Sequence, residues 1–376
     1  MKKPKIFLFL TQVANCGVGY YRQWLPLKRL EEQGKIELRV IDFNWGKKEI
    51  PNPYIAEIGE DQMHDIKLDK KFEEAMHWAD LIYICRDEST PFISVIGGFK
   101  EYFKREKIKK PILVDIDDMV AHTRPHNPGY MSFYPGSSYI PLNKHLATLV
   151  DGITVSTEYL KKFYKNDNKN ISVCPNSLDL RWRDKYADVK PAFKKKKDEI
   201  RIGWAGSAAH WENLKQIEKP LYEIMKKYPN VTFHYTGLYG DLFKWRKMKD
   251  RIKTVGFVDL KEWPKKLKSM GFDIALAPLA DNNFNRAKSN LRVLEYWAAG
   301  YPVIASPVEP YKFIREGVDG YLAMEENEWF DRLELLVKDK YVRNALANKG
   351  YLRVKEEFNV DMNADVWMSV FKKFIS

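Results

Sequence analysis

The chain has 376 residues, more than one hydrophobic core usually serves, so a single small domain is excluded and two domains are expected. Lys and Arg number 63 against 51 Asp and Glu, and the net charge of +12 makes nucleic acid, anionic lipid head groups or acidic glycans plausible partners. No apolar run is long enough to span a bilayer and KIFLFL at 5–10 is too short for a signal peptide, so we expect a cytoplasmic protein, with peripheral binding at an anionic surface as an alternative.

Short apolar runs typical of buried strands alternate with helical stretches through the first half of the chain. The predicted strands are Ile6–Leu10, Leu38–Ile41, Leu81–Cys85, Ile112–Ile116, Ile153–Ser156 and Ile171–Cys174. Strands that alternate with helices predict a parallel sheet with helices packed on it.

A glycine-containing segment, NCGVGYYR at 15–22, follows the first predicted strand. Gly17 and Gly19 then lie at the carboxyl end of that strand, where glycine allows the backbone to approach a phosphate closely. A third glycine is missing, so the segment is not a dinucleotide fingerprint. Tyr21 and Arg22 would contact a ligand here, or they would pack at the start of a helix.

Three carboxylates, Asp115, Asp117 and Asp118, end the strand predicted at 112–116. Carboxylates this close together could bind a divalent metal through oxygen or orient sugar hydroxyls. His122 follows as a further candidate. It begins a long segment at 122–139, rich in Pro, Gly and aromatic residues, that is predicted to be an acceptor lid or a loop held by its own aromatic side chains.

The join between the domains is predicted between Pro175 and Lys197, where Pro191 and four consecutive lysines at 194–197 interrupt any periodicity. The second half then repeats the alternation of strands and helices. Its predicted strands are Ile202–Ala205, Val231–Tyr235, Ile252–Val255, Ile274–Ala277 and Val303–Ala305. The fold class is therefore α/β, with two doubly wound, Rossmann-like domains facing a cleft. The predicted boundaries are 1–178 for the first domain, 179–198 for a linker, 199–356 for the second domain and 357–376 for a final helix.

The most informative stretch is 273–306, DIALAPLADNNFNRAKSNLRVLEYWAAGYPVIAS. After the strand that Pro278 ends, a polar loop leads to Ser289 or Asn290, either of which can cap a helix. Gly300 suits the C-terminal end of that helix and Pro302 forbids its continuation.

Charged side chains gather at the start of this predicted helix. Lys288 and Arg292 flank its free N–H groups, and Glu295 lies one turn further on. In an open parallel sheet, ligands bind at the carboxyl ends of the strands, and a helix N-terminus there favours an anion. A ligand that carries both phosphate and hydroxyl groups would satisfy all three side chains, although each cation alone could belong to a solvated helix face.

Residues 295–306 resemble the donor-nucleotide motif of retaining glycosyltransferases with the GT-B fold, a group that includes glycogen synthases, sucrose synthases and many bacterial mannosyltransferases. The resemblance implies that Glu295 accepts hydrogen bonds from ribose hydroxyls and that the Leu291 amide faces the diphosphate. Ala287 stands where the family carries the first Glu of its Glu-x7-Glu motif. Lys288, Ser289 and Asn290 would replace that Glu, as in a less typical branch with a similar FN-x-x-KS sequence.

Other segments fit the same resemblance. IGWAGS at 202–207 matches the first strand and phosphate-side loop of the family's donor domain, and VGFV at 255–258 matches the place where the base is held. Both segments could equally be a structural turn and core. The segment at 15–22 resembles the family's Gly-rich first loop, and the final helix would cross back to the first domain. The donor-site residues implied in these segments are Gly206, Ser207, His210, Phe257 and Val258.

The predicted activity is transfer of a sugar from a nucleoside diphosphate sugar to an acceptor hydroxyl by a hexosyl- or pentosyltransferase, with retention of configuration implied by the resemblance. Lys288, Arg292 and helix N-termini would stabilise the departing diphosphate, so no metal or other cofactor is expected to be required. For this reason the carboxylates of Asp117 and Asp118 are predicted to recognise sugar hydroxyls rather than a metal, and His122 is a further catalytic candidate.

Expected acceptors are a glycan or a lipid-linked glycan, and modified bases of DNA are an alternative. A non-catalytic nucleic-acid-binding protein is the rival from another class, motivated by the positive charge and the interspersed Trp and Tyr. The basic clusters KKPK at 2–5, KREKIKK at 104–110 and KKKK at 194–197 are dispersed, however, which is usual for a solvated surface. The oligomeric state is not predicted.

Overall fold

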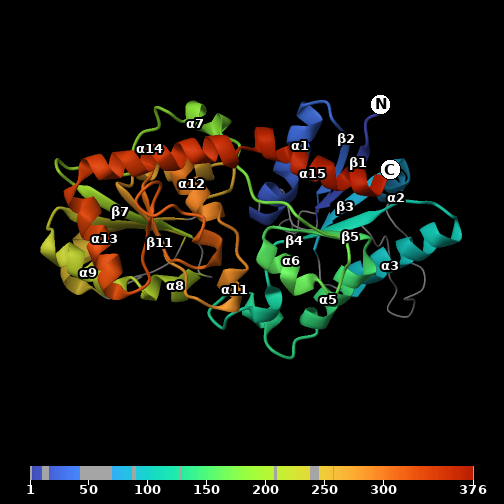
Figure 1. Cartoon of the computed structure of the whole chain (residues 1–376), viewed down its shortest axis with the longest axis horizontal. Helices are drawn as coiled ribbons and strands as arrows, with labels where there is room; N and C mark the ends of the chain where they lie inside the picture. Colours follow the sequence, from blue (N-terminus) through green and yellow to red (C-terminus); the bar gives the residue numbers. More distant parts are fainter. Residues whose placement is uncertain are drawn as a thin grey trace. The chain divides into compact units, whose positions relative to one another are not determined.

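The computed structural model describes residues 2–10, 17–42, 70–86, 90–127, 129–206, 210–237, 245–256 and 258–375. The chain divides into two compact units. The first unit comprises Met1–Asp118, Pro135–Pro175 and Val360–Ser376, and the second comprises Met119–Tyr134 and Asn176–Asn359 (Figure 1).

The first unit is built on a six-stranded parallel sheet with the order β2-β1-β3-β4-β5-β6. Every residue of β3 and β4 is buried, because apolar runs of this kind are covered by helices on both faces of a parallel sheet. The strands are β1 (Lys5–Leu10), β2 (Glu37–Asp42), β3 (Leu81–Cys85), β4 (Ile112–Ile116), β5 (Gly152–Val155) and β6 (Ile171–Val173). Its helices are the π-helical turn η1 (Gly19–Trp24), α1 (Leu25–Glu32), α2 (Lys70–Trp78), α3 (Thr90–Arg105), α5 (Tyr139–Leu149), α6 (Glu158–Tyr164) and α15 (Val360–Ile375).

The second unit has its own six-stranded parallel sheet, in the order β12-β11-β10-β7-β8-β9. Trp204 and Trp329 lie in its core with no exposed surface. The strands are β7 (Ile200–Ala205), β8 (Val231–Thr236), β9 (Ile252–Val255), β10 (Ile274–Ala277), β11 (Val303–Ala305) and β12 (Tyr321–Leu322). Its helices are η2 (Val120–His122), α4 (Tyr130–Phe133), α7 (Arg181–Lys185), α8 (Trp211–Lys215), α9 (Glu218–Lys227), η4 (Arg246–Arg251), α10 (Trp263–Met270), α11 (Asn283–Arg286), α12 (Leu291–Ala299), η5 (Glu309–Tyr311), α13 (Glu326–Lys338) and α14 (Lys340–Glu357).

The predicted fold class is confirmed, since each unit is a parallel sheet with flanking helices. All the strands predicted from the sequence are present within a residue or two of their predicted ends. The sequence missed β12, which has only two residues and therefore carries no periodicity. No helix in the described ranges is long and apolar enough to cross a membrane.

The final helix, α15, packs within the first unit. Asp361 pairs with Arg29 of α1 at 2.6 Å, and Asp365 pairs with Lys35. The Trp367 indole is fully buried and donates from Nε1 to the Tyr83 hydroxyl of β3 at 3.3 Å. These contacts attach the end of the chain to a sheet that its first 173 residues form.

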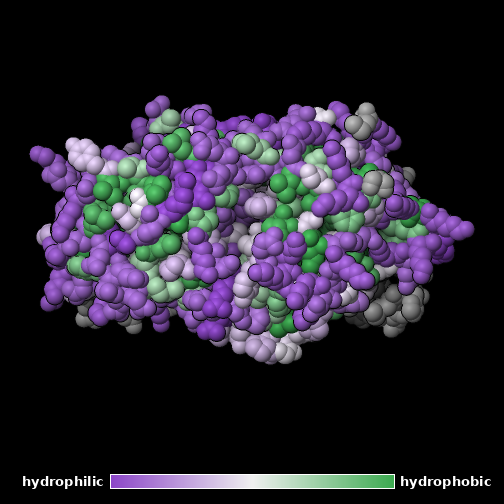
Figure 2. Space-filling model, viewed as in Figure 1, coloured by the Kyte–Doolittle hydropathy of each residue, from purple (hydrophilic) through white to green (hydrophobic). Residues whose placement is uncertain are grey.

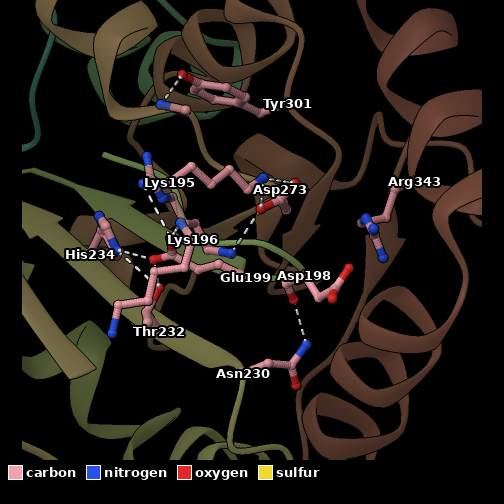
Figure 3. A network of polar contacts seen from close by, with 12 residues as sticks. Lys195, Lys196, Asp198, Glu199, Asn230, Thr232, His234, Asp273, Tyr301 and Arg343 are labelled. Atoms are coloured by element: carbon pink, nitrogen blue, oxygen red, sulfur yellow. Dashed lines mark hydrogen bonds and ion pairs between the residues drawn. The ribbon is translucent and has the colours of Figure 1, made fainter. Parts of the chain in front are cut away.

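The segment before β7, predicted as part of an exposed linker, makes several polar contacts with the second unit. Lys195 pairs with Asp273 at 2.6 Å (Figure 3). Arg201 donates to the Phe193 carbonyl at 3.0 Å. Glu199 accepts from the Lys196 backbone N–H at 2.8 Å. The lysine-rich segment is thus bound to the amino-terminal edge of the second sheet by these contacts.

A buried histidine belongs to this network. His234, 1% exposed, faces Thr232 Oγ1 at 3.0 Å and Glu199 Oε1 at 3.6 Å (Figure 3). Burial, together with the Arg201 charge, lowers the His234 pKa from 6.5 to about 4, although Glu199 acts in the opposite direction. Burial also raises the Glu199 pKa, but hydrogen bonds from Lys196, Arg201 and Thr232 outweigh it and hold that pKa at about 2.

We expect His234 to make the second unit sensitive to mild acid. The unfolded chain protonates this ring near pH 6.5 and the folded chain only near pH 4, so stability falls as the pH drops between these values. At ~1.4 kcal/mol per pH unit over about 2.5 units, the loss is at most about 3.5 kcal/mol. Urea unfolding of wild type and His234→Gln across this range measures it. The variant should show a shallower pH dependence, and equal slopes would contradict the prediction.

Candidate functional site

The predicted helix at 291–300 is present as α12, with Asn290 at its N-cap and Gly300 at its C-terminal end in the left-handed region at φ 84°. The loop before it is held by one buried side chain, Asn213, whose Oδ1 accepts from Ala280 N at 2.9 Å and from Asn285 Nδ2 at 2.8 Å. The first N–H groups of α12 therefore lie in a fixed position beside the carboxyl end of the second sheet.

Arg292 lies in the first turn of α12 with its guanidinium 5.4 Å from the centre of the Trp204 ring. Its Nη1 is buried and has no hydrogen-bond partner among the described residues. A buried donor without a partner costs roughly 1–3 kcal/mol, and more when it is charged. An anion bound at this position would supply the hydrogen-bond acceptor that Arg292 Nη1 lacks.

Gly206, at the end of β7, lets the backbone come close to this guanidinium. A Cβ on Gly206 would lie 2.7 Å from Arg292 Nη2 and 2.6 Å from the Trp204 ring. Gly237, at the end of β8, has φ +87°, and a Cβ there would lie 1.8 Å from the Gly206 carbonyl oxygen. The backbone at Gly206 is thus closely packed between Gly237 and the guanidinium, with its own N–H donated to the Thr236 carbonyl at 3.3 Å.

His210 lies on the same Trp204 side chain as Arg292, with its ring centre 6.5 Å from that of Trp204. Burial and the charges of Arg292 and Lys288 hold the pKa of its imidazole well below 6.5, so the ring is neutral at neutral pH. Because Asn213 Oδ1 already accepts two bonds, Asn213 Nδ2 faces His210 Nδ1 at 3.0 Å and donates to it. The ring proton is then on Nε2, which can donate to a ligand oxygen.

The two residues before the N-cap are also positioned by contacts. Lys288 Nζ lies 4.3 Å from the centre of the Phe284 ring, and Ser289 Oγ accepts from Asn176 Nδ2 at 2.8 Å. Both residues lie beside the start of α12, as the sequence predicted for the end of this loop.

Glu295 is half-buried one turn into α12, and its Oε1 accepts a hydrogen bond from Trp263 Nε1 at 2.9 Å. Sequence reasoning missed Trp263, the first residue of α10, because nothing in the motif at 295–306 points to a residue 32 positions earlier. The indole fixes the orientation of the carboxylate. Val258, predicted beside the base, is half-buried, whereas Ser207 and Phe257 lie outside the described residues.

Arg22 is placed in the interior of the first unit, where it is 1% exposed. Its guanidinium binds both Asp115 oxygens, at 3.1 and 2.8 Å, and also donates to the Cys174 carbonyl. This placement favours helix-start packing over the ligand contact predicted as its alternative. Gly17 is exposed and Gly19 is buried in the helical turn that leads to α1, so the predicted phosphate approach of this segment stays a prediction.

Asp117 follows the carboxyl end of β4 and pairs with Arg86, which follows β3, at 3.5 Å. Burial and the neighbouring Asp118 raise the Asp117 pKa to about 6, although Arg86 opposes this. The three carboxylates are therefore not equivalent, because Asp115 binds Arg22 in the interior while Asp117 lies beside Arg86. Arg86 was missed because an isolated arginine after a strand carries no motif.

His122 belongs to the second unit, where it lines a pocket of about 300 Å³ together with Arg124 and residues of α11. Arg124 and His126 both pair with Glu212 of α8, at 3.2 and 3.0 Å. The first part of the predicted acceptor lid, from His122 to Tyr134, thus belongs to the second unit, where its contacts hold it near the loop that leads to Lys288. Its role as a lid stays a prediction.

Comparisons with known proteins match part of the chain to one family model. Residues 199–339 match the family model described as glycosyl transferases group 1. A comparison with curated proteins gives no match.

Three solved structures resemble this chain over nearly its full length. Anabaena Alr3699/HepE in complex with UDP and glucose is 14% identical, with a TM-score of 0.64, over 97% of this chain and 99% of that one. Sucrose-phosphate synthase from Thermosynechococcus elongatus is 15% identical, with a TM-score of 0.60, over 99% of both chains. A glycosyltransferase from Rickettsia africae is 12% identical, with a TM-score of 0.62, over the full length of both. These likenesses show that the chain has the GT-B fold.

Proposed function

We propose that the protein is a glycosyltransferase that moves a sugar from a nucleoside diphosphate sugar to an acceptor hydroxyl. The observation that carries the proposal is the buried, unpartnered Nη1 of Arg292 beside the Gly206 turn and the start of α12. A diphosphate would supply the missing acceptor atoms. The match of residues 199–339 to a glycosyltransferase family supports the same assignment for the unit that holds these residues.

The proposed donor lies along α12. Its diphosphate accepts from Arg292, from the first amides of the helix and from His210 Nε2, with Lys288 adding charge, while Glu295 accepts from the ribose hydroxyls. Trp263 already fixes Glu295 Oε1, so the carboxylate is oriented before the donor binds. Orientation before binding lowers the entropy lost on association.

In the proposed reaction, the bond between the anomeric carbon and the diphosphate oxygen breaks, and the acceptor oxygen bonds to that carbon. The acceptor proton passes to the departing diphosphate, whose growing negative charge the cations at α12 stabilise. Retention of configuration is proposed on the resemblance of residues 295–306 to retaining enzymes. No step assigned here to the described side chains uses a metal.

We propose a UDP-sugar as the first donor to test, because Anabaena HepE, whose fold this chain shares, has been crystallised with UDP and with UDP-glucose. A glycan or lipid-linked glycan remains the proposed acceptor. Asp117 beside Arg86 offers an acceptor and donors suited to sugar hydroxyls. DNA is not retained as an acceptor, since no contact or pocket in the described parts of the chain favours it.

Incubation with UDP-, GDP-, ADP- and dTDP-sugars, followed by measurement of released nucleotide, tests the function. We expect release from one nucleotide class, and faster release when an acceptor glycan is added. Binding of no nucleotide sugar, measured by calorimetry on folded protein, would contradict the proposal.

We expect Glu295→Ala to weaken nucleotide-sugar binding by ~10- to 100-fold, because hydrogen bonds to a charged group contribute about 1.5–3 kcal/mol. Calorimetry with the donor found above measures the effect. Trp263→Phe removes only the partner that orients Glu295, so its effect should be smaller. Glu223→Ala, a change at α9, is the control and should leave affinity unchanged. Unchanged affinity in folded Glu295→Ala would remove Glu295 from the site.

A further inference from the structure

A groove of about 690 Å³ opens in the first unit among α3, the loop that follows it and the end of α15. Pro111, Asp151 and Asn170, which line it, immediately precede β4, β5 and β6. The groove therefore lies at the amino-terminal edge of the sheet, whereas Asp117 follows the carboxyl end of β4. It plays no part in the function proposed above.

Lysines from separate parts of the chain line this groove, and they outnumber its two carboxylates, Glu101 and Asp151. The lysines are Lys100, Lys104, Lys109, Lys110 and Lys373. The basic cluster at 104–110 is thus not a dispersed surface feature, because the fold brings it together with the end of the chain, more than 250 residues later.

The lysines differ in what they already bind. Lys100 pairs with Asp151, and Lys110 donates to the Met76 carbonyl at 2.8 Å and is partly desolvated, which lowers its pKa. Lys104 and Lys373 are exposed, and neither has a side-chain hydrogen bond or ion pair within the described ranges. These two ammonium groups are available to an external anion.

The same groove has an apolar wall. Phe103 is buried, while Ile108 and Phe374 are half-buried. A Cβ on Gly152 would lie 2.5 Å from the Phe374 ring, so glycine at the start of β5 is what lets this ring pack against the backbone. Cations and apolar side chains on one groove suit a ligand that is itself both anionic and apolar.

We propose that this groove docks the protein on a membrane surface that contains anionic phospholipid, with lipid phosphates on Lys104 and Lys373 and the glycerol region against Ile108 and Phe374. Lysine is a mobile, hydrated point charge, which suits mobile head groups, and no arginine fork for a fixed phosphate lines the groove. The face of the molecule shown in Figure 2 is mostly hydrophilic, with its apolar residues in small groups.

Nucleic acid fits the groove less well. Recognition of single strands uses exposed aromatic faces on which bases stack, whereas the phenylalanines here are buried or half-buried. Docking on lipid also agrees with the absence, among the described helices, of any that could cross the membrane.

Co-sedimentation tests the proposal with vesicles of phosphatidylcholine alone and vesicles that also contain phosphatidylglycerol. We expect binding only to the anionic vesicles, weakening as salt rises. Each lysine near such a surface strengthens partitioning about 5-fold, so Lys104→Glu with Lys373→Glu should weaken it by at least ~20-fold.

The matched control is Lys340→Glu with Lys349→Glu, which changes the net charge equally on exposed positions of α14 in the second unit. This control should lose much less binding. Lys104→Gln with Lys373→Gln, checked for folding by circular dichroism, should fall between wild type and the Glu pair. Equal losses in the two Glu pairs would show a general charge effect and overturn the assignment of the groove.

Two further measurements distinguish binding to a membrane surface from binding to other anions. Soluble glycerol phosphate should not displace the protein from vesicles at millimolar concentration, and displacement would make the groove a small-phosphate site instead. Duplex DNA should bind wild type and the Lys104/Lys373 variants equally, and a loss confined to DNA would overturn the proposal. None of these measurements uses a nucleotide sugar, so their outcome is independent of the proposed enzyme activity.

Discussion

Replacing Arg292 with methionine is expected to lower turnover by ~10²- to 10³-fold while changing donor affinity much less. Loss of one preorganised donor to a developing negative charge has an effect of this size in other enzymes. Arg292 Nη1 is buried without a partner in the described structure, so it is positioned before the charge develops. Methionine keeps an unbranched side chain but removes the guanidinium that lies over the Trp204 ring. Separate measurement of kcat and donor Kd tests the prediction.

Two companion variants sharpen this test. Lys288→Met should also lower turnover, but by less, because its ammonium lies over the Phe284 ring rather than buried beside Gly206. Lys265→Met, on the exposed face of α10, should leave both constants unchanged. A large loss of affinity with turnover preserved would show that Arg292 only docks the donor.

Asp115→Asn is expected to destabilise the first unit by about 3–5 kcal/mol, because it leaves a buried cation without its counter-charge. Asp115 has no exposed surface and accepts from Arg22, from Tyr83 at 3.1 Å and from Thr154 at 2.6 Å. Burial lowers the Arg22 pKa, but the charge of Asp115 and its hydrogen bond more than compensate, so that this pKa is raised above the usual value for arginine. Urea unfolding at neutral pH measures the change.

A double variant that removes both charges tests whether the loss of stability comes from an unpaired buried charge. Asp115→Leu combined with Arg22→Met should recover much of the lost stability, since an apolar pair of similar volume often replaces a buried ion pair without penalty. Asp365→Asn removes an exposed pair with Lys35 and should change stability by less than ~1 kcal/mol. Similar effects of Asp115→Asn and Asp365→Asn would contradict the prediction.

The Arg22–Asp115 ion pair also shows a contact that a sequence motif does not indicate. The segment at 15–22 has glycines after a strand, as phosphate loops do, and its arginine was predicted to contact a ligand or to pack. Only the fold shows that Asp115, 93 residues later, lies within 2.8 Å of that arginine. Long-range ion pairs leave no periodicity in a sequence, so no pattern could have chosen between the two roles.

More of the structure around the start of α12 could be predicted from the sequence, because the residues that indicate it are close together in the chain. A strand of four residues, a polar loop, an N-cap and a glycine at φ 84° all lie within one short stretch of the chain. Trp263 and Asn213, which fix Glu295 and the loop before α12, come from other elements and could not be read from that stretch.

By itself the sequence determined the two alternating series of strands and helices, the position of α12 and the charges at its start. These depend on hydrophobic periodicity and capping, which act over a few neighbouring residues. Only the tertiary structure decided that Arg292 Nη1 is buried without a partner among the described residues, that Arg22 binds Asp115, and that Lys104 and Lys373 line one groove. Each of these depends on which distant segments pack together, and burial, which sets the strength of a charge interaction, exists only once they do.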